Sequence, residues 1–360
     1  MTEPQPFIFD VHLDLSMNAM EWNRDLTQPL EKIRICEANQ TDKPDRSMGT
    51  VCLPEMRKGN VGLCVATQIA RYTKQKNPLP GWHSPAQAWA QSQGQLSWYN
   101  EVERQGELTQ ICNLEQLESH LEKWSTGQNK QLPIGYVLSL EGADSIITLQ
   151  HLESAYEKGL RAIGPAHYGP GTYAPGTGES GPLGNGATEL LREMERLNII
   201  LDVTHLSDTS LDQALDTFSG TVWASHCNCR TLVPGERQLN DHQLKRLIER
   251  GGVIGAALDA WMLIPDWQRG LTTPQSSGVK LSHVVNHIDY VCQLAGNSKH
   301  ACIGTDLDGG FGLEQSPGDM ESIADLQKLP SILGKRGYST DDINNVMGLN
   351  AIDILRSAWK

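Results

Sequence analysis

The chain has 360 residues, of which 39% are hydrophobic, and its formal net charge at pH 7 is −13. A chain of this length buries a large core, either as two ordinary domains or as one large α/β barrel. The acidic balance argues against nucleic acid or an anionic membrane as a partner, because both favour clustered lysine and arginine. Together with the lack of an apolar run long enough to span a bilayer, this favours a small-molecule substrate.

The ends of the chain and its cysteines bear on its location. The first residues, MTEPQPFIFD, contain neither a basic leader nor a long apolar segment, and the last, IDILRSAWK, contain no hydrophobic tail. The eight cysteines are scattered without a CxxC pair, a usage typical of reduced thiols. We therefore expect a cytoplasmic protein.

The predicted elements alternate between short apolar strands and amphipathic helices. Helical spacing of apolar residues occurs at 114–124, 187–197, 211–218, 242–250 and 283–294. Ser207 and Asp208 are candidate helix N-caps, Gly251 and Gly252 stand where a C-cap is expected, and STDD at 339–342 is a capping-box variant. The strand-like segments are 7–15, 61–70, 134–142, 159–167, 199–205, 221–226, 253–259 and 301–306.

This alternation predicts a parallel sheet, and eight such units predict a closed (β/α)8 TIM barrel that forms a single domain over residues 1–360. An open doubly wound sheet is disfavoured because no GxGxxG follows the first strand. Long loops are predicted after strands, on the face where barrels build active sites. They span 15–60, 71–86, 168–185, 260–280 and 307–320.

Ionisable residues stand at the C-terminal end of almost every predicted strand. Four histidines and four carboxylates on one rim would be costly without a counter-ion, and a bound cation removes that cost because carboxylates and neutral imidazoles are its ligands. The residues, in chain order, are His12, Asp14, Glu141, His167, His205, His226, Asp259 and Asp306.

The number of donors indicates two metals. One metal takes about four or five ligands, and the six donors would need one bridging carboxylate to serve two ions. The surplus positive charge would favour a bridging hydroxide as nucleophile. The donors are His12, Asp14, Glu141, His205, His226 and Asp306.

These residues and the motifs around them resemble the membrane (renal) dipeptidase family, peptidase family M19 of the amidohydrolase superfamily. The resemblance runs from DVHLDL to MGLNAIDILR. Its most specific parts are HLD (12–14), LEG (140–142), GPAHYG (164–169), REMERLNIILDVTHLSD (192–208), ASHCNCR (224–230), GGVIG (251–255), HIDYVCQLAG (287–296) and IGTDLDGG (303–310).

The resemblance implies a zinc-dependent dipeptidase with two zinc ions per chain, acting on dipeptides, with L-Xaa-D-Xaa substrates as a suggested preference, and a homodimer. His12, Asp14, Glu141 and Asp306 would hold one zinc, and Glu141, His205 and His226 the other. His167 would stabilise the oxyanion, and Asp306 would carry the proton to the leaving amine. Arg230 would bind the substrate carboxylate, for which Arg237 is a competitor. Manganese, cobalt or iron could replace zinc at such ligands.

Two segments depart from the family's pattern: the first changes the loop after the first motif, and the second bears on the expected substrate. HLDLSMN stands where many members have an HNDLP-like sequence, and Asp259 stands where better-known members place an aromatic hydroxyl. Asp259 would pair with an amino group or basic side chain of the substrate, or hold Arg230. Asp308 is expected to stabilise the loop of Asp306. The alternative function is a related amidohydrolase acting on another amide, a lactone or a biosynthetic intermediate.

Overall fold

The computed structural model describes residues 5–74, 79–126 and 131–360. Residues 1–4 of the amino-terminal segment and residues 75–78 of the predicted 71–86 loop lie outside the described residues. The prediction of one domain over 1–360 includes those residues and stays a prediction. Among the helices of the described part, none is long and apolar enough to cross a membrane.

Eight parallel strands close into a barrel, as predicted. Neighbouring strands pair in the order β2-β1-β9-β8-β7-β6-β5-β4, and β2 pairs with β4 to close the ring. A further strand, β3 (Leu108–Gln110), was not predicted and pairs with the first residues of β4. The barrel strands are β1 (Ile8–Leu13), β2 (Val61–Ile69), β4 (Ile134–Glu141), β5 (Leu160–Gly164), β6 (Ile200–Asp202), β7 (Val222–Ala224), β8 (Val253–Ala256) and β9 (Ala301–Ile303).

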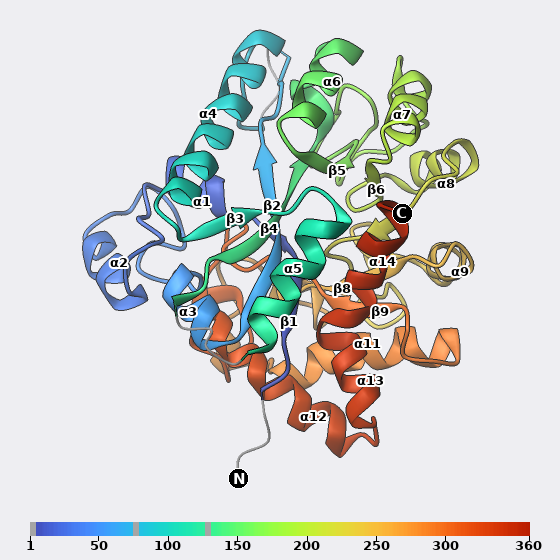
Figure 1. Cartoon of the computed structure of the whole chain (residues 1–360). Helices are drawn as coiled ribbons and strands as arrows, with labels where there is room; N and C mark the ends of the chain where they lie inside the picture. The colour runs from blue at the N-terminus through green and yellow to red at the C-terminus, as the bar shows by residue number, and fades with distance from the viewer. Residues whose placement is uncertain (1–4, 75–78, 127–130) are drawn as a thin grey trace.

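Helices surround this barrel (Figure 1). The five predicted helices are confirmed as α5, α7, α8, α9 and α11. The α-helices are α1 (Leu15–Met20), α2 (Leu30–Glu37), α3 (Leu53–Lys58), α4 (Pro85–Arg104), α5 (Leu114–Ser125), α6 (Leu149–Glu157), α7 (Ala187–Arg196), α8 (Asp208–Thr217), α9 (Asp241–Glu249), α10 (Pro274–Ser277), α11 (Leu281–Ala295), α12 (Leu329–Lys335), α13 (Thr340–Asn344) and α14 (Asn350–Ala358). Short 3-10 helices occur at Ala143–Ser145, Ala260–Met262, Leu313–Gln315 and Ile323–Lys328, and a π-helical turn at Asn345–Leu349.

Ser207 and Ser339 cap helices as predicted, whereas Asp208, the other N-cap candidate, is the first residue of α8. The Ser207 side chain accepts a hydrogen bond from the Ser210 amide at the start of α8. Ser339 and Asp342 form a reciprocal capping box at the start of α13. Gly251 follows the end of α9 with a φ of +71°, which favours glycine.

The inside of the barrel is filled by apolar side chains from its strands, among them Phe9, Val137 and Trp223. Helix α14 adds Ile352 and Leu355 to the same cluster, and α14 lies across the strands together with α5 (Figure 1). Since the strands are parallel, their N-terminal ends meet on this covered side, and their C-terminal ends face the long loops on the other.

Candidate metal centre

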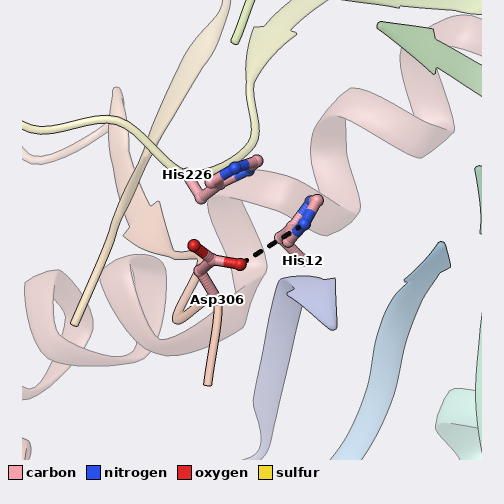
Figure 2. Close-up of side chains that lie close together, drawn as sticks. All are labelled: His12, His226 and Asp306. Atoms are coloured by element: carbon pink, nitrogen blue, oxygen red, sulfur yellow. Dashed lines mark ion pairs between the residues drawn. The ribbon is translucent and has the colours of Figure 1, made fainter. Parts of the chain in front are cut away.

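The six predicted ligands converge at the C-terminal face of the barrel. His12 lies in β1 and Asp14 directly after it, and Glu141 is the last residue of β4. Donor atoms lie within 4.8 Å of one another in each of three groups: His12, Asp14 and Glu141; Glu141, His205 and His226; and His12, His226 and Asp306. Figure 2 shows the third group, with the Asp306 carboxylate turned toward the His12 ring.

Glu141 occupies the middle of the cluster and presents one oxygen to each half. Its Oε1 lies 3.1 Å from His205 Nε2 and 3.3 Å from His226 Nε2. Its Oε2 lies 3.7 Å from His12 Nε2. His12 Nε2 is also 3.8 Å from Asp14 Oδ1 and 3.7 Å from Asp306 Oδ1. A carboxylate with its two oxygens divided in this way is suited to bridge two cations.

The backbone and neighbouring side chains fix the directions of these ligands. His205 and Asp306 have φ values of +67° and +57°, so each residue turns sharply out of its strand direction. Asp10 accepts hydrogen bonds from the His12 and Thr305 amides. Asp202 likewise accepts from the Thr204 and Ser225 amides. The two buried acids therefore join β1 to β9 and β6 to β7 directly beneath the ligands.

The electrostatics of the cluster favour a bound cation. Burial raises the pKa of Glu141 and Asp306 well above the usual range, and raises that of Asp14 to about 6. Burial also lowers the pKa of His12 to about 3, so the imidazole is neutral as a ligand must be. His12 Nε2 is buried without a hydrogen-bond partner among the described residues. This orphaned nitrogen among three carboxylates fits a metal.

His167 lies beside this cluster, as predicted, with Nε2 3.9 Å from Glu141 Oε2. Its backbone is held by the 168–185 loop, where the Thr177 amide donates to the His167 carbonyl at 2.9 Å. Gly176 makes this approach possible, since a Cβ there would lie 1.7 Å from the His167 oxygen. The Arg71 guanidinium donates to His167 Nδ1.

A pocket of about 330 Å³ opens beside Asp14 and His167. Sequence reasoning did not single out Arg71, Trp22 or Trp82, which line it. Arg71 stands directly beyond the end of β2. Its position after a strand end is the sequence feature that could have identified it as a candidate site residue. The other lining residues are Met17, Glu21, Lys43, Ile69, Ala70, Pro80, Gly81, Tyr168, Gly309 and Gly310.

Arg230 and Arg237, the two candidates for binding the substrate carboxylate, have different surroundings. Arg230 forms two hydrogen bonds to Asp208, at 2.8 and 2.7 Å, and lies at the partly exposed edge of the loop. Arg237 is 4% exposed and donates to the His226 carbonyl at 2.9 Å. In the described part of the chain, no carboxylate lies within 4.0 Å of its guanidinium. Its charge contributes to the lowered pKa of His12 and His226, after burial.

Asp259 and Asp308 are both buried, with their own partners. Asp259 accepts hydrogen bonds from Trp261 at 2.6 Å, Gln315 at 2.8 Å and Arg269 at 3.3 Å, and Arg230 is not among them. Burial raises the pKa of Asp259 to about 6. Asp308 accepts from the Thr50 and Val51 amides and ties the loop after β9 to the segment before α3.

A closed (β/α)8 barrel with buried histidines and carboxylates gathered at its C-terminal face defines the class of metal-binding barrel proteins. Within that class, the sequence matches the family described as membrane dipeptidase (peptidase family M19) over residues 4–360, and the chain belongs to this family.

Solved structures of the same family share the fold. The crystal structure of dipeptidase AC, a metallopeptidase of family M19, is 21% identical with a TM-score of 0.79, and the match covers 99% of each chain. A metallopeptidase from Rhodobacter sphaeroides, liganded with a phosphinate mimic of the dipeptide L-Ala-D-Ala, is 19% identical with a TM-score of 0.77; the match covers 99% of this chain and 100% of that one.

Curated relatives match part of the chain. Dipeptidase tcpJ from Claviceps purpurea is 29% identical over 233 residues, which are 62% of this chain and 51% of the relative. The match therefore spans about half the length of that dipeptidase. An uncharacterized protein in the pqqA 5′ region of Klebsiella pneumoniae is 28% identical over 217 residues, or 58% of this chain and 76% of the relative.

Proposed function

We propose that the protein is a dipeptidase that uses two divalent metal ions, zinc in the first instance, to hydrolyse the peptide bond of a dipeptide. The observation that carries the proposal is the division of the Glu141 carboxylate between two halves of one buried cluster. Membership of peptidase family M19 supports it.

The donors fall into two sets that share Glu141. His12, Asp14 and Asp306 complete one set, and His205 and His226 complete the other, in line with the distances between their donor atoms. When bound, two divalent ions would lower the pKa of a water molecule and polarise the substrate carbonyl. Manganese, cobalt or iron would suit the same ligands.

The remaining residues act on the substrate. Asp306 would take a proton from the attacking water and transfer it to the leaving amine, since its carboxylate lies within the cluster. His167 would donate a hydrogen bond from Nε2 to the carbonyl oxygen, where negative charge develops. The strands and loops around Asp306 and His167 fix both side chains, so these side chains would need to move little when the substrate reacts.

We assign the substrate carboxylate to Arg237 in preference to Arg230. Arg237 is buried beside His226 and has no carboxylate partner in the described structure, whereas Arg230 is paired with Asp208. A buried arginine without an ion pair is suited to bind a carboxylate from a ligand. Asp259 is proposed to contact the amino group or a basic side chain of the substrate.

The substrate, the location and the assembly are proposed on different grounds. A pocket of about 330 Å³ is at the lower end of the range for small-molecule sites and matches a dipeptide. The phosphinate mimic of L-Ala-D-Ala in the Rhodobacter sphaeroides relative supports an L-Xaa-D-Xaa preference. A cytoplasmic location is proposed from the scattered cysteines without a CxxC pair, and a homodimer from the resemblance to the family.

The test is hydrolysis of a panel of L,L- and L,D-dipeptides by zinc-loaded protein, with chelated protein in parallel. We expect turnover that is lost with the metal and restored by adding zinc, and faster turnover of L,D-dipeptides. A Glu141→Gln variant would lose both turnover and one equivalent of bound metal. If two metals bind per chain and no dipeptide is hydrolysed, the dipeptidase assignment is wrong.

A further inference from the structure

Four histidines share the rim of the barrel, and they differ in the group that contacts Nδ1. The Nδ1 atoms of His12 and His226 lie 3.3 and 2.8 Å from the Ser225 hydroxyl. His205 Nδ1 lies 2.8 Å from the Thr177 hydroxyl. His167 Nδ1 instead contacts the Arg71 guanidinium.

A hydroxyl partner allows an imidazole to serve as a metal ligand. An oxygen of serine or threonine accepts hydrogen bonds, so Nδ1 can keep its proton and Nε2 its lone pair. Ser225 has the capacity to accept from both rings while donating its own hydrogen to Thr204, 3.3 Å away. His12, His205 and His226 can therefore all present Nε2 as a donor atom to a cation.

A guanidinium partner has the opposite effect. Arginine carries only N–H donors and stays protonated, so His167 Nδ1 must accept. In the neutral ring the single proton then stands on Nε2. This N–H is directed to the side of the ring that faces Glu141, with Nε2 3.9 Å from Glu141 Oε2.

Other contacts hold the Arg71 side chain where it can donate to His167 Nδ1. It stands beyond the end of β2 and donates to the Pro80 carbonyl at 2.8 Å. Across the part of the chain that the structure describes, no carboxylate lies within 4.0 Å of its guanidinium. Asp144 binds the amides of Tyr72 and Thr172, and so ties the loop that carries Arg71 to the loop after His167.

We propose that Arg71 is a positioning residue that locks His167 in the Nε2–H tautomer, which makes this histidine a hydrogen-bond donor to the substrate carbonyl instead of a fourth histidine ligand of the metals. The tautomer follows from the contacts of the side chains alone. Its use on a carbonyl oxygen rests on the proposed function.

The tautomer is measured directly by nitrogen NMR of protein labelled with ¹⁵N-histidine, with His167→Gln used to assign the signals. We expect a pyrrole-type Nε2 and a pyridine-type Nδ1 for His167 in both the chelated and the zinc-loaded protein. In Arg71→Met the two signals should move toward each other as both tautomers become populated. Unchanged signals in Arg71→Met would overturn the proposal.

Steady-state kinetics test whether Arg71 affects turnover by acting on His167. Loss of one oxyanion donor lowers kcat by about 10²–10³-fold, and a partly populated tautomer should cost about 10- to 100-fold with KM nearly unchanged. Arg71→Lys, which keeps a donor-only side chain, should recover part of kcat. In a His167→Gln background, Arg71→Met should cost no more than about twofold; a full additive loss would contradict action through His167.

Two controls separate folding and function from the proposal. Arg104→Met makes the same chemical change on the exposed end of α4 and should alter neither the NMR signals nor kcat. Two bound zinc ions and an unchanged circular dichroism spectrum in Arg71→Met exclude a folding defect. If the NMR shift occurs and the protein hydrolyses no dipeptide, the tautomer proposal stands and the dipeptidase assignment fails.

Discussion

At the scale of single residues, Arg230 and Arg237 follow the same strand, β7, and have opposite surroundings. We expect Arg237→Met to raise KM for a dipeptide by about 10- to 100-fold, because a hydrogen bond between charged groups contributes about 1.5–3 kcal/mol. Arg230→Met should leave KM within about twofold and lower Tm, since it breaks the contact to Asp208. Steady-state kinetics and thermal denaturation of the two variants measure both effects.

The two variants serve as controls for each other. Both remove one guanidinium from the same loop, so a general effect of charge or loop structure would appear in both. A large rise in KM for Arg230→Met with none for Arg237→Met would reverse our assignment of the carboxylate anchor and support the original sequence-based prediction.

Buried His287 gives a prediction about pH. Burial lowers its pKa to about 4, against about 6.5 in the unfolded chain. Between these values the unfolded state binds more protons, so the free energy of unfolding falls as the pH is lowered, by about 3 kcal/mol in total. His287→Gln keeps an acceptor for the Cys229 amide and removes this titration. We therefore expect a shallower loss of stability between pH 7 and pH 4.

Chemical denaturation of chelated wild type and variant at each pH measures this difference. Both proteins keep the histidines of the candidate metal centre, so the contribution of those groups is common to the two curves. Equal slopes of the unfolding free energy against pH would show that His287 does not titrate as its burial indicates.

The sequence indicated the candidate metal ligands better than the groups around them. Histidines and acidic residues at strand ends form a local pattern that can be recognised in the sequence. This pattern indicated His12, Glu141, His205, His226 and Asp306. Asp10 and Asp202, which fix the strand ends beneath the ligands, carry no such signal. Their role depends on which neighbouring strand offers an amide, and that depends on register.

At the scale of secondary structure, α4 is the longest helix among the described residues, and the sequence did not predict it. The reason is physical. Helix α4 buries Ser92 and Gln95 along with Leu96 and Tyr99, so its inward face lacks a clear apolar period. Gln95 is buried because it bonds both the amide and the carbonyl of Ile69 at the end of β2, at 2.8 Å each. Strand β3 was missed because its sequence, LTQ, contains no apolar run, in contrast to the equally short β7 (VWA) and β9 (ACI).

Helix α14 closes the end of the barrel away from the candidate metal centre. Leu355→Ala in this helix should lower the free energy of unfolding by about 2–5 kcal/mol, because Leu355 is fully buried in the barrel core. Turnover per folded molecule should be unchanged. The matched control is Arg356→Ala, which removes a contact to Glu118 at the surface and should cost less than about 1 kcal/mol.

Denaturant unfolding and kcat, measured on the same preparations, decide this prediction. A loss of kcat in Leu355→Ala at full folding would mean that packing at the covered end controls the geometry of the opposite face. Equal destabilisation by the two substitutions would mean that α14 contributes little to the barrel core.

At the scale of the whole molecule, metal and fold are expected to be coupled. A ligand present at 1,000 times its Kd stabilises the folded state by about 4 kcal/mol, which for 360 residues corresponds to a rise in Tm of about 5 °C. We expect chelation to lower Tm by about this amount and zinc to restore it. The same Tm with and without a chelator would argue against metal binding at the buried cluster.

The sequence by itself determined the barrel and the rim on which the candidate ligands lie. Both rest on local patterns: apolar strands alternating with amphipathic helices, and ligand-type residues where those strands end. Tertiary structure decided which oxygen of Glu141 faces which histidine, that Arg237 and not Arg230 lies beside the cluster, and that His167 receives a guanidinium where the other histidines meet hydroxyls. These features depend on contacts between segments far apart in the chain, and such contacts exist only once the barrel has closed.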